Sequence, residues 1–181
     1  MTAARQIRNI ALIGFMGTGK TSVGHLVAGR LGFTFLDTDH LIERRAGMTI
    51  SDIFTQHGEA RFREIEREVV EGLADRERCV IATGGGVGAN PELLASLKRH
   101  ALVACLWASP ERIWQRVCRQ LHRPLLHVPD PQQRIRELLA LRRPFYRQAD
   151  VLLNADTREV PQTAAQLIKE FRFVTGGGGG Q

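Results

Sequence analysis

Cysteines and long apolar segments are both scarce in this sequence. Its three cysteines, Cys79, Cys105 and Cys118, are odd in number and far apart, so we expect neither a disulfide framework nor a CxxC-type metal site. No apolar run approaches the roughly 20 residues that a membrane-spanning helix needs. The apolar run after Arg5 and Arg8 stops at a glycine-rich loop, which argues against a secretory signal. We therefore expect a cytoplasmic protein with reduced thiols and no membrane association.

Acidic residues are fewer than basic ones, and this imbalance bears on the possible partners. Among 181 residues, 25 are Lys or Arg and 19 are Asp or Glu, which gives a formal net charge of +6. Such a charge suits nucleic acid, an anionic membrane surface or small anions. Because the arginines are spread along the chain rather than massed in a tail, small anionic ligands are favoured. Apolar residues at 43% and charged residues at 24% are typical of a globular domain.

Apolar runs of strand length alternate with helical patterns along the chain. The predicted strands are residues 10–13, 33–36, 80–82, 102–107 and 151–153. The predicted helices are residues 20–31, 41–46, 50–56, 59–73, 91–97, 110–121, 132–143 and 162–171. Five strands separated by helices predict a three-layer α/β fold, in which an open parallel sheet carries helices on both faces.

Nothing in the sequence divides it into separate domains. We find no internal repeat and no linker, so residues 1–174 are expected to form a single domain. The stretch 122–130 contains two prolines and is interpreted as an exposed loop, within a mobile lid over about residues 118–131. The glycine run at 176–180 predicts a disordered tail over residues 175–181.

The clearest motif is a phosphate-binding loop. Residues 14–21 read Gly-Phe-Met-Gly-Thr-Gly-Lys-Thr, which matches the spacing G-x-x-x-x-G-K-[ST] between a predicted strand and a predicted helix. Glycines let successive backbone N–H groups point at phosphate oxygens, and the helix that follows adds its N-terminal dipole. Lys20 is placed to reach the β- and γ-phosphates, and the Thr21 hydroxyl to bind Mg²⁺. This context argues against a chance match in a turn, so the loop predicts nucleotide binding.

The loop does not identify the phosphate acceptor, because ATPases, GTPases and many kinases share it. A GTPase would also need a guanine-reading Asn-Lys-x-Asp after a strand, and the corresponding residues 106–109 read Leu-Trp-Ala-Ser. A GTPase is therefore disfavoured. Ligands of open parallel sheets bind beyond the carboxyl ends of the strands, so the acceptor site is sought at the other strand ends.

Carboxylates and glycines follow two of the predicted strands. Asp37 and Asp39, two residues apart on a segment interpreted as extended, would point to the same side, one toward the Mg²⁺ shell and the other toward a hydroxylated substrate. The alternative is that Asp39 caps the next helix. The backbone of Gly84, Gly85 and Gly86 could approach a ligand closely, or could form a flexible turn.

Three arginines are candidates for binding anions. Arg63 stands between Glu59 and Glu66 on a predicted helix. These acids either hold its guanidinium in place for a substrate carboxylate or form ordinary surface ion pairs. Arg123, in the predicted lid, could stabilise charge on a phosphoryl group in transfer. Arg142 lies near the end of a helix, where pairing with the helix dipole is the alternative.

The motifs occur in an order that resembles the shikimate kinase family over residues 7–172. They are the P-loop, Asp37-Thr38-Asp39, Phe62-Arg63 with Glu66, Gly84-Gly85-Gly86, Arg123-Pro124-Leu125-Leu126, and Arg142, Pro144 and Tyr146. The resemblance implies a nucleoside-monophosphate-kinase-like P-loop fold with sheet order 2-3-1-4-5. It also implies transfer of the γ-phosphoryl group of ATP to the 3-hydroxyl of shikimate, in aromatic amino acid biosynthesis.

The resemblance gives each candidate residue a role. Shikimate would be bound by groups on the acceptor side, namely Asp39, Arg63, Gly84, Gly85, Gly86 and Arg142. ATP would be bound by the loop and by three arginines, namely Gly17, Thr18, Gly19, Lys20, Thr21, Ser22, Arg116, Arg123 and Arg158. Mg²⁺ would be bound by Thr21 and, through its water shell, by Asp37. Catalysis would depend on Lys20, Asp39 and Arg123. Asp39 would hold the hydroxyls, Arg63 and Arg142 the carboxylate, and Arg116 would stack on adenine; the match around Arg158 is looser.

Two other functions stay open from the sequence alone. A gluconate-type or nucleotide kinase of the same fold would keep Lys20 and Thr21 and change the acceptor site. A basic P-loop protein that binds nucleic acid would need a clustered basic stripe with interleaved aromatics, which the sequence lacks. No large apolar surface stripe indicates an obligate dimer, so a monomer is expected.

Overall fold

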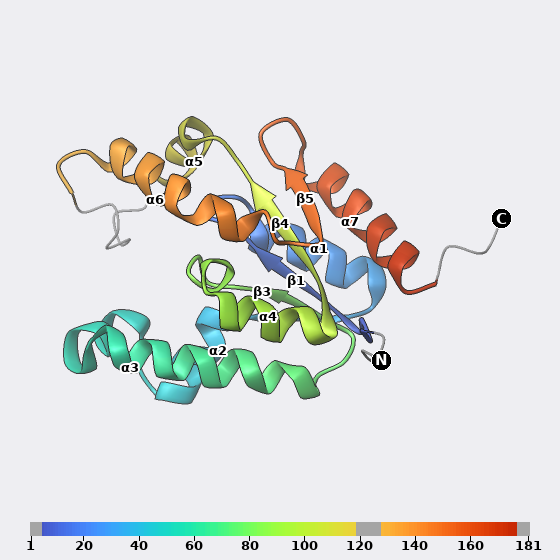
Figure 1. Cartoon of the computed structure of the whole chain (residues 1–181), viewed down its shortest axis with the longest axis horizontal. Helices are drawn as coiled ribbons and strands as arrows, with labels where there is room; N and C mark the ends of the chain where they lie inside the picture. Colours follow the sequence, from blue (N-terminus) through green and yellow to red (C-terminus); the bar gives the residue numbers. More distant parts are fainter. Residues whose placement is uncertain (1–4, 119–127, 177–181) are drawn as a thin grey trace.

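A five-stranded parallel sheet lies at the centre of the computed structural model, which describes residues 5–118 and 128–176 (Figure 1). The strands are β1 (Asn9–Ile13), β2 (Thr34–Asp37), β3 (Cys79–Ala82), β4 (Ala101–Trp107) and β5 (Val151–Asn154). They pair in the order β2-β3-β1-β4-β5, which confirms the predicted sheet order. β1 is therefore the central strand, and ligands are expected beyond its carboxyl end.

Helices cover both faces of this sheet. They are α1 (Lys20–Leu31), α2 (Thr38–Ala46), α3 (Ile50–Gly72), α4 (Pro91–His100), α5 (Pro110–Val117), α6 (Pro131–Tyr146) and α7 (Val160–Val174), with short 3₁₀ turns η1 (Leu73–Asp75) and η2 (Val87–Ala89). Ala11 and Ile13 of β1 pack into the apolar cluster formed with α3, α4, α5 and α6. Ile10 and Leu12 point the other way, into the cluster formed with α1 and α7. Both faces of β1 are buried, which explains its unbroken apolar run and confirms the three-layer arrangement.

α3 contains a break that the sequence places between two helices. Helices are predicted over residues 50–56 and 59–73, and the structure has one element with non-helical backbone at Gly58 (φ 77°, ψ 175°). Ile53 before the break and Phe62 after it both pack against Ile42 of α2 in a small third cluster. This packing against α2 therefore fixes the position of α3 on both sides of the break. Arg63 lies in the first turns after the break.

α2 begins three residues earlier than predicted. The sequence suggested a helix from residue 41, with Asp37 and Asp39 on extended backbone before it. In the structure Asp37 ends β2 and caps α2, since its side chain accepts a hydrogen bond from the Asp39 N–H. Asp39 lies in the first turn of the helix, so both the extended geometry and the expectation that Asp39 itself could be the cap are wrong.

α6 runs further than predicted, to Tyr146, with Pro144 inside its last turns. Arg142 and Tyr146, four residues apart, consequently lie on the same side of the helix. At the other end, α5 is seen to Val117, whereas its prediction extended to residue 121. Most of the predicted lid, including Arg123, and most of the predicted tail lie outside the described residues. Within residues 5–118 and 128–176, no helix is long and apolar enough to span a bilayer.

Candidate active site

The phosphate-binding loop connects β1 to α1 and is held by its own side chains. Lys20 opens α1, and its Nζ donates to the carbonyl oxygens of Gly14 and Phe15, each at 2.9 Å. The Thr18 side chain is buried and its Oγ1 donates to the same Phe15 oxygen at 2.8 Å. A Cβ on Gly14 would lie 2.3 Å from the Leu106 carbonyl oxygen of β4, so only glycine fits between the two strands. The Thr18 hydroxyl is thus engaged within the loop, which leaves its backbone N–H for the predicted contact with phosphate.

Arg116 joins the two sides of the predicted nucleotide site. Its guanidinium donates to the Gly17 carbonyl at 3.1 Å and to the Ala155 carbonyl at 3.0 Å. It thus links the phosphate-binding loop, α5 and the segment after β5 that leads to Arg158. Arg158 is exposed before α7 and donates to the side chain of Gln166. Its predicted contact with the nucleotide stays a prediction.

A buried threonine connects the ends of β2 and β3. Thr38 is fully buried, and its Oγ1 accepts a hydrogen bond from the Gly84 N–H at 2.9 Å. Asp37 and Asp39, on either side of it, are partly exposed. This hydrogen bond therefore ties the end of β2 to the end of β3. It brings Asp39 against the residues Gly84, Gly85 and Gly86, which we call the glycine segment.

The glycine segment leaves room for the site's own charged side chains. A Cβ on Gly84 would lie 2.7 Å from Asp39 Oδ1, and a Cβ on Gly86 would lie 2.8 Å from Arg63 Nη1. Such distances are too short for carbon against oxygen or nitrogen, so alanine at either position would displace Asp39 or Arg63. The groups that lie close to these glycines are a carboxylate and a guanidinium of the protein itself, and the expected approach to a ligand stays a prediction.

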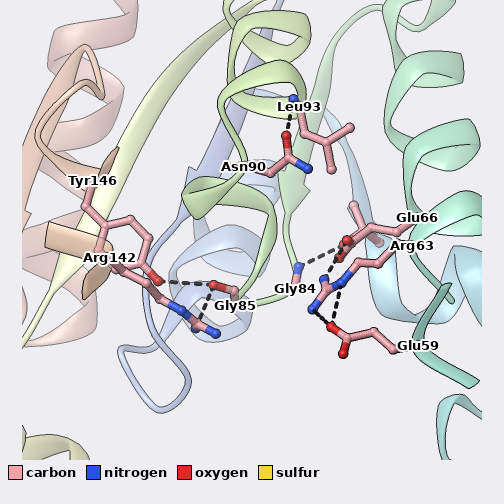
Figure 2. A network of polar contacts seen from close by, with 10 residues as sticks. Glu59, Arg63, Glu66, Gly84, Gly85, Asn90, Leu93, Arg142 and Tyr146 are labelled. Atoms are coloured by element: carbon pink, nitrogen blue, oxygen red, sulfur yellow. Dashed lines mark hydrogen bonds and ion pairs between the residues drawn. The ribbon is translucent and has the colours of Figure 1, made fainter. Parts of the chain in front are cut away.

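Arg63 is held in a fork of two glutamates, as the helical spacing predicts (Figure 2). Its Nη1 donates to Glu66 at 2.8 Å, while Nε and Nη2 donate to Glu59 at 3.2 and 3.1 Å. The Glu66 side chain is only 2% exposed, against 66% for Glu59. Partial burial lowers the pKa of Arg63, but the hydrogen bonds and charges of Glu66 and Glu59 outweigh it and raise that pKa overall. Arg63 is therefore a fixed, permanent cation.

Arg142 and Tyr146 reach the glycine segment from α6 (Figure 2). Arg142 Nη1 donates to the Gly85 carbonyl at 3.0 Å, and the Tyr146 hydroxyl donates to the same oxygen at 3.1 Å. The Arg142 guanidinium also lies over the Phe15 ring, 5.3 Å from its centroid. Burial raises the pKa of Tyr146 to about 12, so its hydroxyl remains a donor at any ordinary pH.

A pocket of about 540 Å³ is lined by both Arg63 and Arg142. It is lined by Arg63, Arg67, Gly86, Ala89, Asn90, Pro91, Glu92 and Arg142. Among the described residues, Glu92 is the only carboxylate in this lining, and it pairs with Arg67 at 3.0 Å. Arg63 is paired with Glu59 and Glu66, whereas Arg142 forms no ion pair in the described part of the chain. The guanidiniums of Arg63 and Arg142 on this lining suit a small anion.

The structure thus brings together most of the predicted acceptor residues. Arg63, Gly86 and Arg142 line one pocket, and Gly84 and Gly85 contact Asp39 and Arg142 at its edge. Sequence reasoning gave no role to Thr38, Phe15 or Tyr146. Thr38, the first residue of α2, acts through one hydrogen bond, and Phe15, in the phosphate-binding loop, acts through one ring contact. No spacing rule signals such contacts. Tyr146 was part of a motif, four residues after Arg142, and this helical spacing was an available signal.

The predicted Mg²⁺ ligands, Thr21 and Asp37, carry the oxygen groups that a Mg²⁺ site requires. The Thr21 hydroxyl is exposed beside Lys20, and Asp37 has a partly exposed carboxylate at the end of β2. Hydroxyl, carboxylate and water oxygens are the donors that Mg²⁺ prefers. Among the described residues there is no cluster of three or more His, Cys, Asp or Glu side chains that would bind a metal without phosphate.

Comparison with known proteins agrees with this geometry. The family model for shikimate kinase matches residues 16–172. The shikimate kinase of Thermodesulfovibrio yellowstonii is 46% identical over 94% of this chain and 99% of its own length. That of Symbiobacterium thermophilum is 47% identical over 91% and 96%.

Solved structures show the same relationship. A shikimate kinase from Acinetobacter baumannii, solved in complex with shikimate, superposes with a TM-score of 0.87 at 37% identity, covering 98% of each chain. A sugar kinase from Janibacter, at 17% identity and a TM-score of 0.64, shares the fold alone. With its phosphate-binding loop, its paired arginines and these relatives, the chain belongs to the shikimate kinase family.

Proposed function

We propose that this protein phosphorylates the 3-hydroxyl of shikimate with ATP, giving shikimate 3-phosphate and ADP, a step of aromatic amino acid biosynthesis. The observation that carries the proposal is a single pocket lined by Arg63, Arg142 and Gly86, with Asp39 against the neighbouring Gly84. Shikimate is a small ring with one carboxylate and three hydroxyls. It needs cations at one end and a hydrogen-bond acceptor at the other.

The two arginines would bind the substrate carboxylate. Charge-assisted hydrogen bonds from guanidinium to carboxylate are strong and directional. Arg63 is fixed by Glu59 and Glu66, and Arg142 by the Gly85 carbonyl and the Phe15 ring, so little side-chain freedom is lost on binding. Asp39 would accept hydrogen bonds from the substrate hydroxyls.

ATP would lie along the phosphate-binding loop. Backbone N–H groups of residues 17–22 and the Lys20 ammonium would bind the phosphates, and Arg116 would contact the base. Thr21 and Asp37 would hold Mg²⁺, which when bound neutralises charge on the phosphate oxygens. We expect Arg123 to add positive charge from the lid; it lies outside the described residues.

The chemical step needs positioning more than covalent help. The 3-hydroxyl oxygen attacks the γ-phosphorus, the bond to ADP breaks, and the hydroxyl proton passes to Asp39 as the new bond forms. The Lys20 ammonium would stabilise the negative charge that develops on the phosphoryl oxygens. The rate would therefore depend on how Asp39 and Lys20 are held relative to the bound substrates.

The substrate is tested with a coupled ADP-release assay on shikimate, quinate, gluconate and nucleoside monophosphates. We expect turnover with shikimate, at least tenfold faster than with any other acceptor. Gluconate has a carboxylate and hydroxyls but no ring, quinate carries an additional hydroxyl beside its carboxylate, and nucleoside monophosphates have no carboxylate for the two arginines. Turnover with gluconate or a nucleotide but not with shikimate would reject the proposal and favour another small-molecule kinase of this fold.

Asp39→Asn tests the mechanism. Because the amide keeps the size of the carboxylate but cannot take the proton, we expect kcat to fall about 100-fold or more. The Kd for ATP, measured by calorimetry, should change less than about twofold. Asp75→Asn, an exposed carboxylate outside the pocket, serves as the control and should have native activity. Near-native turnover of the Asp39 variant would show that Asp39 has no catalytic role.

We propose a cytoplasmic monomer that does not bind nucleic acid. An electrophoretic shift assay at moderate salt tests nucleic-acid binding, and sedimentation tests the oligomeric state.

A further inference from the structure

A second pocket lies on the other side of α6, toward β4 and β5. Its volume is about 600 Å³, within the range of small-molecule sites. It is lined by Phe15, Thr18, Leu106, Trp107, Ala108, Ser109, Pro110, Arg136, Leu139, Ala140, Arg143, Tyr146, Arg147 and Leu152. Phe15 and Thr18 of the phosphate-binding loop line one edge of it, but Lys20, Asp39, Arg63 and Arg142 do not. The groups proposed for the chemical step therefore lie outside this pocket.

The wall of this pocket formed by the sheet is apolar and unusually exposed. Trp107 at the end of β4 is 47% exposed, and Leu152 of β5 is 49% exposed. Leu139 and Ala140 of α6 also line the pocket. Large apolar side chains exposed on one surface favour an apolar occupant, because its binding removes their surface from water. A flat ring suits a wall made of an indole and a branched side chain.

The α6 side of the same pocket carries positive charge. Arg136, Arg143 and Arg147 follow at intervals of seven and four residues, which places them along one side of the helix. Arg136 is paired with Glu111 at 3.3 Å. In the described part of the chain, Arg143 and Arg147 form no ion pair, and no acidic side chain lines the pocket. Two guanidiniums are therefore available to an anion at the edge of an apolar surface.

We propose that this pocket binds a small aromatic carboxylate. The ring would lie against Trp107 and Leu152, and the carboxylate would pair with Arg143 and Arg147. Both halves of the ligand are required: the apolar wall alone would not select an anion, and two exposed arginines alone would bind anions only weakly. The pocket borders the proposed sites through Phe15, Thr18 and Tyr146, but the ring and the carboxylate of the ligand would contact other residues, so we expect it to bind while shikimate and nucleotide are also bound.

The test follows Trp107 directly by NMR. The chain has two tryptophans, so Trp114→Phe leaves Trp107 as the only indole N–H signal. The protein is saturated with shikimate and ADP, then titrated with 2-naphthoate. We expect a saturable shift of the Trp107 signal with a Kd at or below about 1 mM. The neutral analogue 2-naphthylmethanol should bind at least about fivefold more weakly, because it cannot pair with the arginines.

Variants locate the binding. Arg143→Ala combined with Arg147→Ala should raise the Kd for naphthoate about fivefold or more. Leu152→Glu, which places a negative charge in the apolar wall, should abolish the shift. Arg134→Ala is the matched control, since Arg134 is on α6 but does not line the pocket, and it should bind as the parent does. Thermal denaturation of each variant verifies that it is folded.

Several results would overturn the proposal. They are no saturable shift, equal binding of the neutral analogue, and equal loss in the Arg134 control. Complete displacement of naphthoate by shikimate and ADP would place the probe in the kinase site instead. A Trp107 shift that depends on protein concentration without any probe would show that a second copy of the chain covers this surface. Because binding is read from Trp107 and not from turnover, failure here is distinct from failure of the proposed kinase activity.

Discussion

The Arg63 guanidinium is held by two glutamates that differ greatly in exposure. Glu66 is nearly inaccessible, with 2% of its side chain exposed, and its hydrogen bond to Arg63 measures 2.8 Å. Glu59 reaches the same guanidinium from solvent, at 3.1 Å and 3.2 Å. A buried charge pair loses more on disruption than an exposed one, because the remaining charge has no water to replace its partner. The two glutamates should therefore contribute unequally to substrate binding.

Replacement of each glutamate by glutamine measures this difference. Glu66→Gln removes the buried negative charge that fixes Arg63, and we expect the KM for shikimate to rise roughly five- to tenfold while kcat changes little. Glu59→Gln is the matched control, with an expected rise of less than about twofold. Steady-state kinetics at saturating ATP provide the measurement. Equal effects of the two changes would mean that burial of Glu66 does not matter for Arg63.

At the scale of elements, the break in α3 depends on one residue. Gly58 has φ 77° and ψ 175°, a backbone conformation essentially restricted to glycine, although its missing side chain would meet nothing within 4 Å. The cost of a substitution there is therefore conformational rather than steric. Gly29, inside α1, also has open space around it but has helical backbone. Replacement of each glycine by alanine therefore compares the same substitution in two different backbone conformations.

Gly58→Ala should lower the free energy of unfolding by about 1–3 kcal/mol, because alanine is strained at this φ and ψ. Gly29→Ala should raise it by about 0.5–1 kcal/mol, since alanine is the better helix former and has room for its methyl group. Urea denaturation followed by circular dichroism gives both values. A Gly58 variant as stable as the parent would show that the break is not required by packing of α2 against α3.

The sequence predicted the type of nearly every element, but not where several of them begin and end. β1 and α1 were placed within one residue, because an apolar run and a glycine-rich loop mark their limits. The start of α2 was misplaced, since the Asp37 side chain caps a helix whose first turn contains Thr38 and Asp39. The end of α6 was misplaced because Pro144 normally signals a stop, whereas the helix continues to Tyr146. The Asp37 cap is a local contact between residues two apart, but the sequence pattern does not decide between Asp37 and Asp39 as the cap. The pattern also does not show whether a helix tolerates a proline in its last turns.

At the scale of the whole molecule, Asp150 connects segments that are distant in the chain. It accepts a hydrogen bond from the Val103 N–H at 2.8 Å, pairs with Arg5 at 2.7 Å and lies 3.4 Å from Lys98. The start of β5, the middle of β4, the end of α4 and the N-terminal segment meet at this carboxylate. Its partial burial raises the pKa of Asp150, but Arg5, Val103 and Lys98 outweigh burial and lower it below 3.8 overall.

This lowered pKa predicts a pH-dependent contribution to stability. The carboxylate binds protons less readily folded than unfolded, so its contribution is complete above the unfolded value of 3.8 and is lost as pH falls through the folded pKa. Asp150→Asn should reduce the free energy of unfolding by about 1–2 kcal/mol at neutral pH, after allowance for solvent screening. The difference between parent and variant should shrink below pH 3.8.

Denaturation with urea across the acidic range measures the Asp150 effect. Glu77→Gln is the control, because Glu77 pairs with Arg8 in an exposed position and should change the unfolding free energy by less than about 0.5 kcal/mol at any pH. A constant difference between the parent and the Asp150 variant down to the most acidic pH would contradict the lowered pKa.

The candidate site was predicted as a set of residues, and the structure adds how they are held. Arg63 with its glutamates, and the glycines after β3, followed from spacing and strand order. Three supports were not predicted: the Thr38 hydroxyl that joins β2 to β3, the Phe15 ring beneath Arg142, and the Gly85 carbonyl shared by Arg142 and Tyr146. Each joins residues far apart in the chain, so only the folded arrangement could reveal it.

The central position of β1 has a consequence for how this protein can be modified. Asp39, Arg63 and the glycine segment belong to elements on the β2 and β3 side of β1, whereas Arg116 and the Ala155 carbonyl belong to the β4 and β5 side. Under the proposed function, the acceptor and the base of the nucleotide would thus be recognised largely from separate halves of the sheet, with the phosphate-binding loop after the central β1 and with Arg142 as the main exception. Changes of acceptor preference can therefore accumulate in one half, by evolution or by engineering, while the other half continues to bind the same nucleotide.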